Sequence, residues 1–241
     1  MNIDKFIYYA KKESWSQLNL TNLSLDNIPP NLFELEDLIW LNLSNNNLKI
    51  LPSNISTLKN LQTLILSNNQ FERLSGKLGQ LKKLRILDLS KNKLEYLPSE
   101  IFGLNNLIQL DIMENKLKYL PKELKNLKNI KILDLYKNNL IGLPVEIGSL
   151  ENINCLRVSN NNLNFLPKEI NNLNHLVCLY LDNNNLKLLP DLDNLDNLEE
   201  IHLEHNKLKN IPKSLMKLKK LSYIDLNKNK ICKSKKSTYL M

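Results

Sequence analysis

The chain is poor in glycine, in cysteine and in long apolar runs. Its 241 residues contain 5 glycines, 3 cysteines and only 6% aromatic residues. So few glycines argue against glycine-rich phosphate loops, and a small, odd number of cysteines suits a reducing compartment better than a disulfide framework. No apolar run reaches the ~18 residues that a membrane-spanning helix needs. The residues after Met1 lack a secretory signal. We therefore expect a cytoplasmic protein.

Catalytic motifs are also missing. The sequence has no Gly-x-Ser-x-Gly, Cys-x-x-Cys, His-Glu-x-x-His or Gly-x-x-x-x-Gly-Lys pattern, and it contains only 3 histidines. We therefore expect no enzyme activity, no cofactor and no small-molecule substrate.

What the chain has instead is a line of asparagines at a fixed spacing. Seven of the eight intervals between them are 23 residues and one is 22. Each asparagine ends the phrase Leu-x-x-Leu-x-x-Leu-x-Leu-x-x-Asn-x-Leu, and such a period is typical of a repeat solenoid. The asparagines are Asn46, Asn69, Asn92, Asn115, Asn138, Asn161, Asn184, Asn206 and Asn229.

One repeat shows how the phrase predicts structure. Leu133-Asp134-Leu135 alternates apolar and polar residues, which predicts a short strand with one buried face. Asn138 follows where the chain leaves the strand, and its amide can donate to and accept from the backbone of neighbouring turns. Pro144 then precedes residues at a spacing of three, which predicts one or two turns of α- or 3-10 helix.

These residues resemble the leucine-rich repeat, and the 23-residue period with Leu-Pro-x-x-Ile-x-x-Leu resembles its Ras-group intracellular subclass. The resemblance implies an α/β solenoid, with a parallel sheet on the concave face and short helices on the convex face. It also implies a scaffold or regulatory protein, possible partners being a small GTPase, a kinase or a phosphatase in signalling. The repeat after Leu173 is one residue short near Pro190, which should pinch the convex side.

The ends of the chain differ from the repeats. Residues 1–14 predict an amphipathic helix that caps the array, with Asn2 or Asp4 at its start. Residues 15–231 form the array of about ten repeats, and residues 232–241 are a basic tail or partial cap. We find no second domain and expect a monomer.

The register predicts which side chains line the concave face. Its columns carry eight acidic and four basic residues, so the face has a charge of −4 and the rest of the chain +12, for a total of +8. Stacked carboxylates repel one another, and tolerating them beside apolar side chains favours a site for a basic, partly apolar protein surface. The alternative is that strand-facing aspartates are common in such repeats and simply solvated. The residues expected to bind a protein partner are Trp40, Ile86, Asp88, Asp111, Met113, Asp134, Tyr136, Arg157 and Tyr180.

Two smaller features have alternative interpretations. Glu200, His202 and Glu204 form a weak metal candidate, but an open groove favours a solvated polar patch, so we expect no metal. Cys155 and Cys178 fall on adjacent strands, where reduced thiols are favoured over a disulfide in a reducing compartment.

Rival functions remain open at this point. The pI of about 9.2 suggests nucleic acid, but the acidic groove argues against it. The lysine-rich convex side and the basic tail could instead bind an anionic surface, nucleic acid or membrane, although we do not expect a membrane protein. The chain could also be a surface or secreted recognition protein, or part of a larger enzyme.

Overall fold

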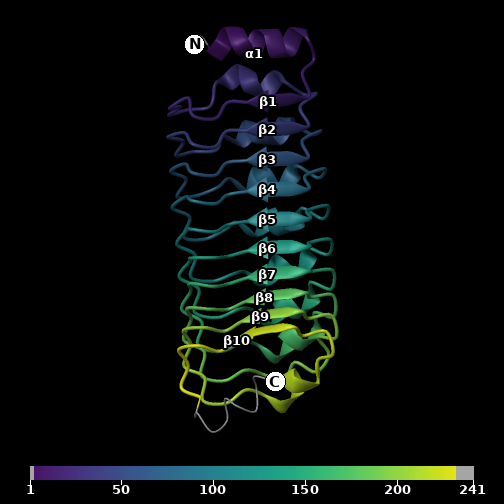
Figure 1. Cartoon of the computed structure of the whole chain (residues 1–241). Helices are drawn as coiled ribbons and strands as arrows, with labels where there is room; N and C mark the ends of the chain where they lie inside the picture. Colours follow the sequence, from purple (N-terminus) through teal and green to yellow (C-terminus); the bar gives the residue numbers. More distant parts are fainter. Residues whose placement is uncertain (1–2, 232–241) are drawn as a thin grey trace.

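The computed structural model describes residues 3–231 and forms a stack of repeats with one parallel sheet (Figure 1). The predicted basic tail at 232–241 lies outside these residues. Neighbouring strands pair in sequence order from β1 to β10, all parallel. The strands are β1 Gln17–Asn19, β2 Trp40–Asn42, β3 Thr63–Ile65, β4 Ile86–Asp88, β5 Gln109–Asp111, β6 Ile132–Asp134, β7 Cys155–Arg157, β8 Cys178–Tyr180, β9 Glu200–His202 and β10 Tyr223–Asp225.

Short 3-10 helices cover the other side of the array. A proline precedes all but one of them, because its fixed φ suits the helix start and its missing N–H is not needed there. In the exception, the side chain of Ser75 accepts a hydrogen bond from the backbone N–H of Lys77 and so caps the helix. The helices are η1 Pro30–Glu34, η2 Ser53–Thr57, η3 Gly76–Gln80, η4 Ser99–Gly103, η5 Lys122–Asn126, η6 Val145–Ser149, η7 Lys168–Asn172 and η8 Lys213–Lys217.

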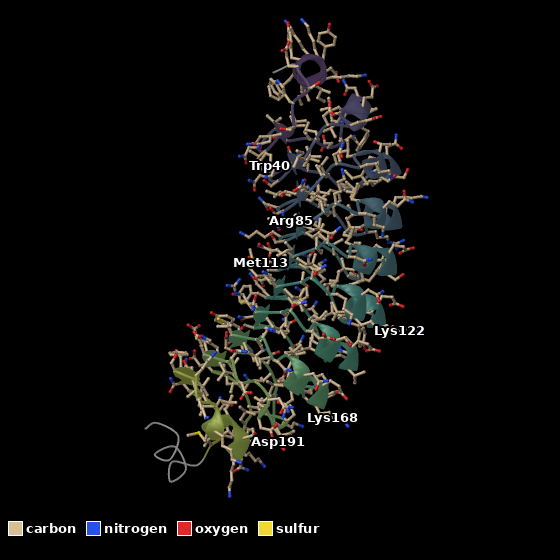
Figure 2. The ribbon with its side chains drawn as sticks, turned by 90° about the vertical axis from the view of Figure 1, so that its right-hand side faces the viewer. Trp40, Arg85, Met113, Lys122, Lys168 and Asp191 are labelled. Atoms are coloured by element: carbon tan, nitrogen blue, oxygen red, sulfur yellow. The ribbon has the colours of Figure 1, made fainter. Side chains whose placement is uncertain are left out.

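The array bends toward its sheet. Figure 2 looks along the strands, with Trp40 and Met113 on the inner side and Lys122 and Lys168 on the helical outer side. Strands stack about 4.8 Å apart, whereas helices need more room, so the sheet lies on the concave face. The inward-facing leucines and isoleucines form one continuous core cluster. These observations confirm the predicted solenoid.

The short repeat departs from the pattern. Among the described residues no helix lies between β8 and β9, where every other pair of consecutive strands has one. Neighbouring side chains replace the missing helix bonds: Ser214 Oγ accepts from the Leu192 N–H at 3.2 Å, and Asn171 Oδ1 accepts from the Asn194 N–H at 3.0 Å. Losing one residue therefore removes a helix on the convex side.

The spaced asparagines form a buried ladder. Asn69 is typical: its Nδ2 donates to the carbonyls of Leu43 and Leu66 at 2.9 and 3.1 Å, and its Oδ1 accepts from the Leu48 N–H at 3.0 Å. Two of these partners belong to the preceding repeat, so each amide joins neighbouring turns. Buried backbone groups need such partners because an unmade hydrogen bond costs free energy.

A second, exposed ladder follows the opposite edge, before β3 and before β5 to β9. Asn106 and Asn129 donate to carbonyls of the preceding repeat, Lys82 at 2.8 Å and Asn105 at 2.7 Å. His175 occupies the same position, with Nδ1 at 2.8 Å from the Glu151 carbonyl. That histidine therefore has a structural partner in the ladder.

One residue per repeat has a left-handed backbone immediately before the buried asparagine. Asparagine tolerates this conformation best among non-glycine residues and occupies it at Asn45 and Asn68, with φ of 55° and 53°. Lys91, Glu114 and Lys137 hold the same conformation with φ of 53°, 54° and 54°. The turn therefore fixes the direction in which these side chains leave the backbone at the margin of the sheet.

The N-terminal helix α1 (Ile3–Lys12) covers the first repeat. Ile7 and Ala10 are buried, and Phe6 packs edge-to-face on Trp15 with ring centroids 5.2 Å apart. Asp4 accepts a hydrogen bond from the Asn31 side chain at 3.1 Å. Within residues 3–231, no helix has the length and hydrophobicity needed to cross a bilayer.

Candidate functional site

The central row of the concave face joins six strands. Its members are successive register partners, so their side chains stand next to one another across the sheet. In order they are Asp88, Asp111, Asp134, Arg157, Tyr180 and His202.

Two of the three aspartates have a local structural role. Asp88 Oδ1 accepts from the backbone N–H of Ser90 at 2.9 Å, and Asp134 Oδ1 accepts from that of Tyr136 at 3.0 Å. Asn42, at the equivalent position of β2, makes the same bond at 2.9 Å. An asparagine therefore satisfies the backbone equally well, and the aspartates add negative charge that the turn does not need.

Asp111 is different because its carboxylate does not bond to that backbone N–H. Its Oδ2 accepts from Gln109 Nε2 at 2.8 Å on the same strand. Burial, with a further contribution from the Asp88 and Asp134 carboxylates, raises the pKa of Asp111 to about 6, although the Gln109 hydrogen bond and the Arg157 charge oppose this. Asp111 is thus a carboxyl group whose charge changes near neutral pH.

Arg157 covers the third aspartate. Its Nη1 lies 3.5 Å from Asp134 Oδ2, and its guanidinium carbon lies 5.4 Å from the centre of the Tyr180 ring. Asp134 is buried, with 7% of its surface exposed, whereas the Arg157 side chain is 45% exposed. A partner approaching this point would meet the arginine rather than the carboxylate, which the sequence pattern had placed on the surface of the face.

Beyond Arg157 the row becomes aromatic. Tyr180 and His202 stack with ring centroids 4.4 Å apart, and Tyr223 packs on the other side of His202 at 4.7 Å. The Tyr180 hydroxyl donates to Glu200 Oε2 at 3.1 Å, and burial together with this bond raises the pKa of Tyr180 to about 12. Sequence analysis missed this stack, although the register of Tyr180 and His202 was its signal.

The other predicted partner residues divide into two groups. Ile86, Met113 and Tyr136 are half-buried on β4 and just beyond β5 and β6, so they border the carboxylate row. Trp40 is also half-buried but lies on β2, two strands before Asp88. The structure therefore gathers the predicted site over β4 to β8 and leaves Trp40 apart from it.

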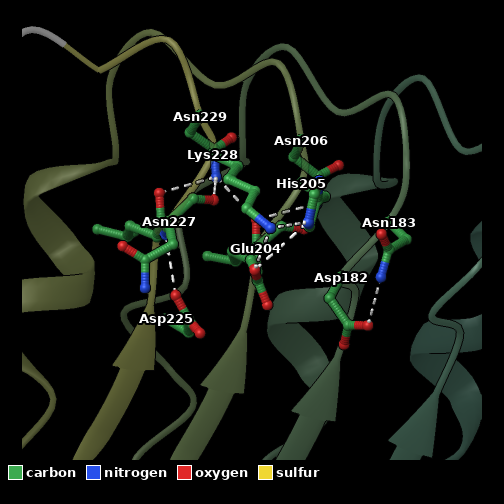
Figure 3. A network of polar contacts seen from close by, with 11 residues as sticks. Asp182, Asn183, Glu204, His205, Asn206, Asp225, Asn227, Lys228 and Asn229 are labelled. Carbon is green, nitrogen blue, oxygen red and sulfur yellow. Dashed lines mark hydrogen bonds and ion pairs between the residues drawn. The ribbon is translucent and has the colours of Figure 1, made fainter.

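The weak metal candidate is engaged by other groups. Glu204 Oε1 lies 3.5 Å from Lys228 Nζ, and that same Nζ donates to His205 Nε2 at 2.8 Å (Figure 3). This donation requires an unprotonated Nε2, so the 3.4 Å contact of that nitrogen with Glu204 is not an ion pair in this state. His202 Nε2 lies 3.7 Å from Glu200 Oε2. Residues 3–231 contain no group of three potential metal ligands close enough to hold an ion.

Cys155 and Cys178 are register partners on β7 and β8, and both are free thiols. Burial raises the pKa of Cys155 to about 11 and also raises the pKa of Cys178. The reactive thiolate is therefore scarce at neutral pH.

Sequence analysis missed a second exposed surface. We call the six residues that follow each ladder asparagine, from Asn46 to Asn206, the loop edge. It holds eight lysines and arginines against two carboxylates, a charge of +6 in a chain whose total is +8. Large apolar side chains, 42 to 72% exposed, also lie along it. This apolar row consists of Ile50, Tyr96, Tyr119, Ile141, Phe165 and Leu188.

Family models match most of the chain. A model described as a leucine-rich repeat region matches residues 118–241, and one described as leucine rich repeat matches 16–71, 59–117 and 82–140. A comparison with curated protein sequences gave no match.

Solved structures agree with this assignment. A leucine-rich repeat protein of Leptospira interrogans is 36% identical with a TM-score of 0.90, over 92% of this chain and 57% of that one. The ectodomain of the Arabidopsis thaliana membrane receptor kinase GASSHO1/SCHENGEN3, in complex with CASPARIAN STRIP INTEGRITY FACTOR 2, is 33% identical with a TM-score of 0.75, over 89% of this chain and 30% of that one. The plant peptide hormone receptor RGFR1, in complex with RGF2, is 28% identical with a TM-score of 0.65, over 89% and 44%.

The chain thus spans less than two thirds of the length of each of these proteins. The repeat phrase, the parallel sheet and the family models all agree, and the chain belongs to the leucine-rich repeat family.

Proposed function

We propose that this chain is a non-enzymatic interaction module that binds a basic, partly apolar protein surface across β4 to β8 of its concave face. The family and fold are typical of protein-interaction modules, and several similar structures are complexes with protein or peptide ligands. A cytoplasmic location, a monomeric state and a role in signalling are further parts of this proposal.

The observation that carries the proposal is the surplus charge of the central row. Asn42 forms the turn bond that Asp88 and Asp134 form, so that turn bond does not require a carboxylate. Asp111 is held partly buried between the two and forgoes that bond altogether. Charge retained at such a cost fits recognition of a cationic partner.

The surroundings fit the same kind of partner. Ile86, Met113 and Tyr136 offer half-buried apolar surface beside the carboxylates. The exposed guanidinium of Arg157 marks the end of the acidic stretch and would repel cations placed further along. The binding energy should therefore concentrate on β4 to β6, since a few central residues usually dominate an interface.

The test is affinity capture from a lysate of the source cells, followed by titration of the retained protein. The variant changes Asp88, Asp111 and Asp134 to Asn, which keeps the shape and the turn bonds and removes three charges. We expect the affinity for the partner to fall at least about tenfold, because close interfacial charge pairs contribute more than 1 kcal/mol each.

A matched control removes three charges from the convex side, through Glu123, Glu146 and Glu169 changed to Gln. The control should retain the partner as the wild type does. Equal capture by the wild type and the concave variant would contradict a site on the central row.

A further inference from the structure

The loop edge combines exposed apolar side chains with a charge of +6. Five of the six side chains of the apolar row recur at multiples of the 23-residue repeat, so they lie in single file along the array. Where the repeat has Gly142 instead, the Phe165 ring lies beside it, 3.8 Å from where a Cβ would stand, and Ile141 is exposed at the preceding position. The row is therefore nearly continuous from Tyr96 to Leu188, and Arg73 separates Ile50 from it.

The row exposes more apolar surface than scattered single residues on a protein surface do. Its side chains are 42 to 72% exposed. They present on the order of 700 Å² of apolar and aromatic surface, whereas the largest patch of a typical monomer covers about 300–600 Å². The folding core does not use this surface, which indicates a binding role.

The positive charge beside the apolar row indicates which kind of partner can bind there. Lys116 and Lys118 precede Tyr119, and Lys187 precedes Leu188. None of the ion pairs found within residues 3–231 involves a lysine or arginine of the loop edge. A second copy of this edge would bring like charges together, so the charge favours an anionic occupant.

The interruption of the row at Arg73 adds a cationic recess. Ser75 stands where other repeats have proline, and here a cavity of about 540 Å³ opens, lined by Lys49, Arg73 and Lys93 together with the carboxylate of Glu72. Three cations against one carboxylate suit a phosphate-bearing group of modest size.

The shape of the edge favours a flat occupant. The array bends within the plane of view of Figure 2, which looks along the strands. Loops at the ends of the strands therefore lie close to one plane, even though the sheet and helix faces are curved. A flat surface can reach the whole row at once.

We propose that the loop edge docks on an anionic lipid bilayer. Aromatic and aliphatic side chains of the row would enter the interfacial layer, and the flanking lysines would lie among phospholipid headgroups. This surface is separate from the concave site, so the array can bind a protein and a membrane together. An acidic amphipathic protein segment is the other occupant that fits this charge. The two occupants can be distinguished because binding to a membrane requires lipid alone.

The test is co-sedimentation of the full chain with vesicles of phosphatidylcholine containing about one third phosphatidylserine, or of phosphatidylcholine alone. We expect binding to the first and little to the second. The changes Ile50, Tyr119 and Leu188 to Ser should weaken binding about tenfold, and so should Lys116, Lys118 and Lys187 changed to Glu. All six residues are exposed, so circular dichroism should match the wild type.

Two controls separate this proposal from others. Lys59, Lys131 and Lys219 changed to Glu reverse the same charge elsewhere and should leave vesicle binding unchanged, as should the concave asparagine variant. No binding to anionic vesicles would overturn the proposal. So would binding that the serine variant leaves intact, or an acidic protein captured by this edge without any vesicle binding.

Discussion

At the scale of single residues, burial and two neighbouring carboxylates destabilise the negative charge of Asp111. It is partly buried between two other carboxylates, and its single hydrogen-bond donor is a side chain, Gln109. Its neighbours in the column satisfy backbone groups instead, which ties them to the fold. Asp111 is therefore the residue of the row whose loss of charge should increase the stability of the fold.

Asp111→Asn should stabilise the protein at neutral and alkaline pH. The folded-state pKa is raised from 3.8 to about 6, so the folded state binds more protons than the unfolded state between these values. The contribution of Asp111 to stability is thus most favourable below pH ~4 and is lost as the pH rises through about 6. Urea unfolding should show the variant more stable by about 1–2 kcal/mol above pH ~7, after allowance for solvent screening, and equal to the wild type near pH ~4. A difference that does not change with pH would contradict this account.

At the scale of elements, two ladders join the repeats, and burial distinguishes them. Asn138 donates to the carbonyls of Ile112, Leu135 and Tyr136 and accepts from the N–H of Leu117. It is 6% exposed, so water cannot replace these bonds if the amide is removed. Asn129 makes one ladder bond at an exposed edge, where water can substitute.

Removing one amide from each ladder should therefore have unequal effects. We expect Asn138→Ala to lower the free energy of unfolding by about 2–3 kcal/mol, and Asn129→Ala by less than about 1 kcal/mol. Chemical denaturation of both variants under identical conditions measures the difference. Equal losses would show that burial does not set the strength of the two ladders.

At the scale of the whole molecule, stability passes from repeat to neighbouring repeat. Helix α1 closes the first end of the core through Ile7, which is 1% exposed. Ile7→Asp buries an unpaired carboxylate and should undock the helix, at a local cost of about 3 kcal/mol or more. Hydrogen exchange should then show lost protection in β1 and β2 and unchanged protection in β6 to β8. Loss spread evenly over all strands would argue against nearest-neighbour stability.

The whole molecule also separates its charges. The concave row is acidic, whereas the loop edge carries a charge of +6 in a chain whose total is +8. Two surfaces of opposite charge on different sides of one array can serve different occupants, which is the basis of the two proposals. The high pI thus comes from surfaces outside the groove, among them the loop edge.

Much of the fold was predictable because the repeat makes every local signal recur. Alternating Leu133-Asp134-Leu135 predicted a strand, and the spacing of asparagines predicted the register that places Asp88, Asp111 and Asp134 side by side. The apolar row has the same periodicity, but the pattern alone does not distinguish these exposed loop side chains from the buried leucines beside them. The short repeat near Pro190 predicted a local pinch of the convex side, but it did not predict that the helix would be lost.

The repeat period, the strand register and the inward leucines could be predicted from the amino-acid pattern, because they follow from spacing along the chain. How neighbouring side chains share space depends on the folded structure. It turned Arg157 over Asp134, gave Gln109 to Asp111, and stacked Tyr180 on His202. Such choices depend on rotamers, burial and distances between repeats, and a one-dimensional pattern contains none of these.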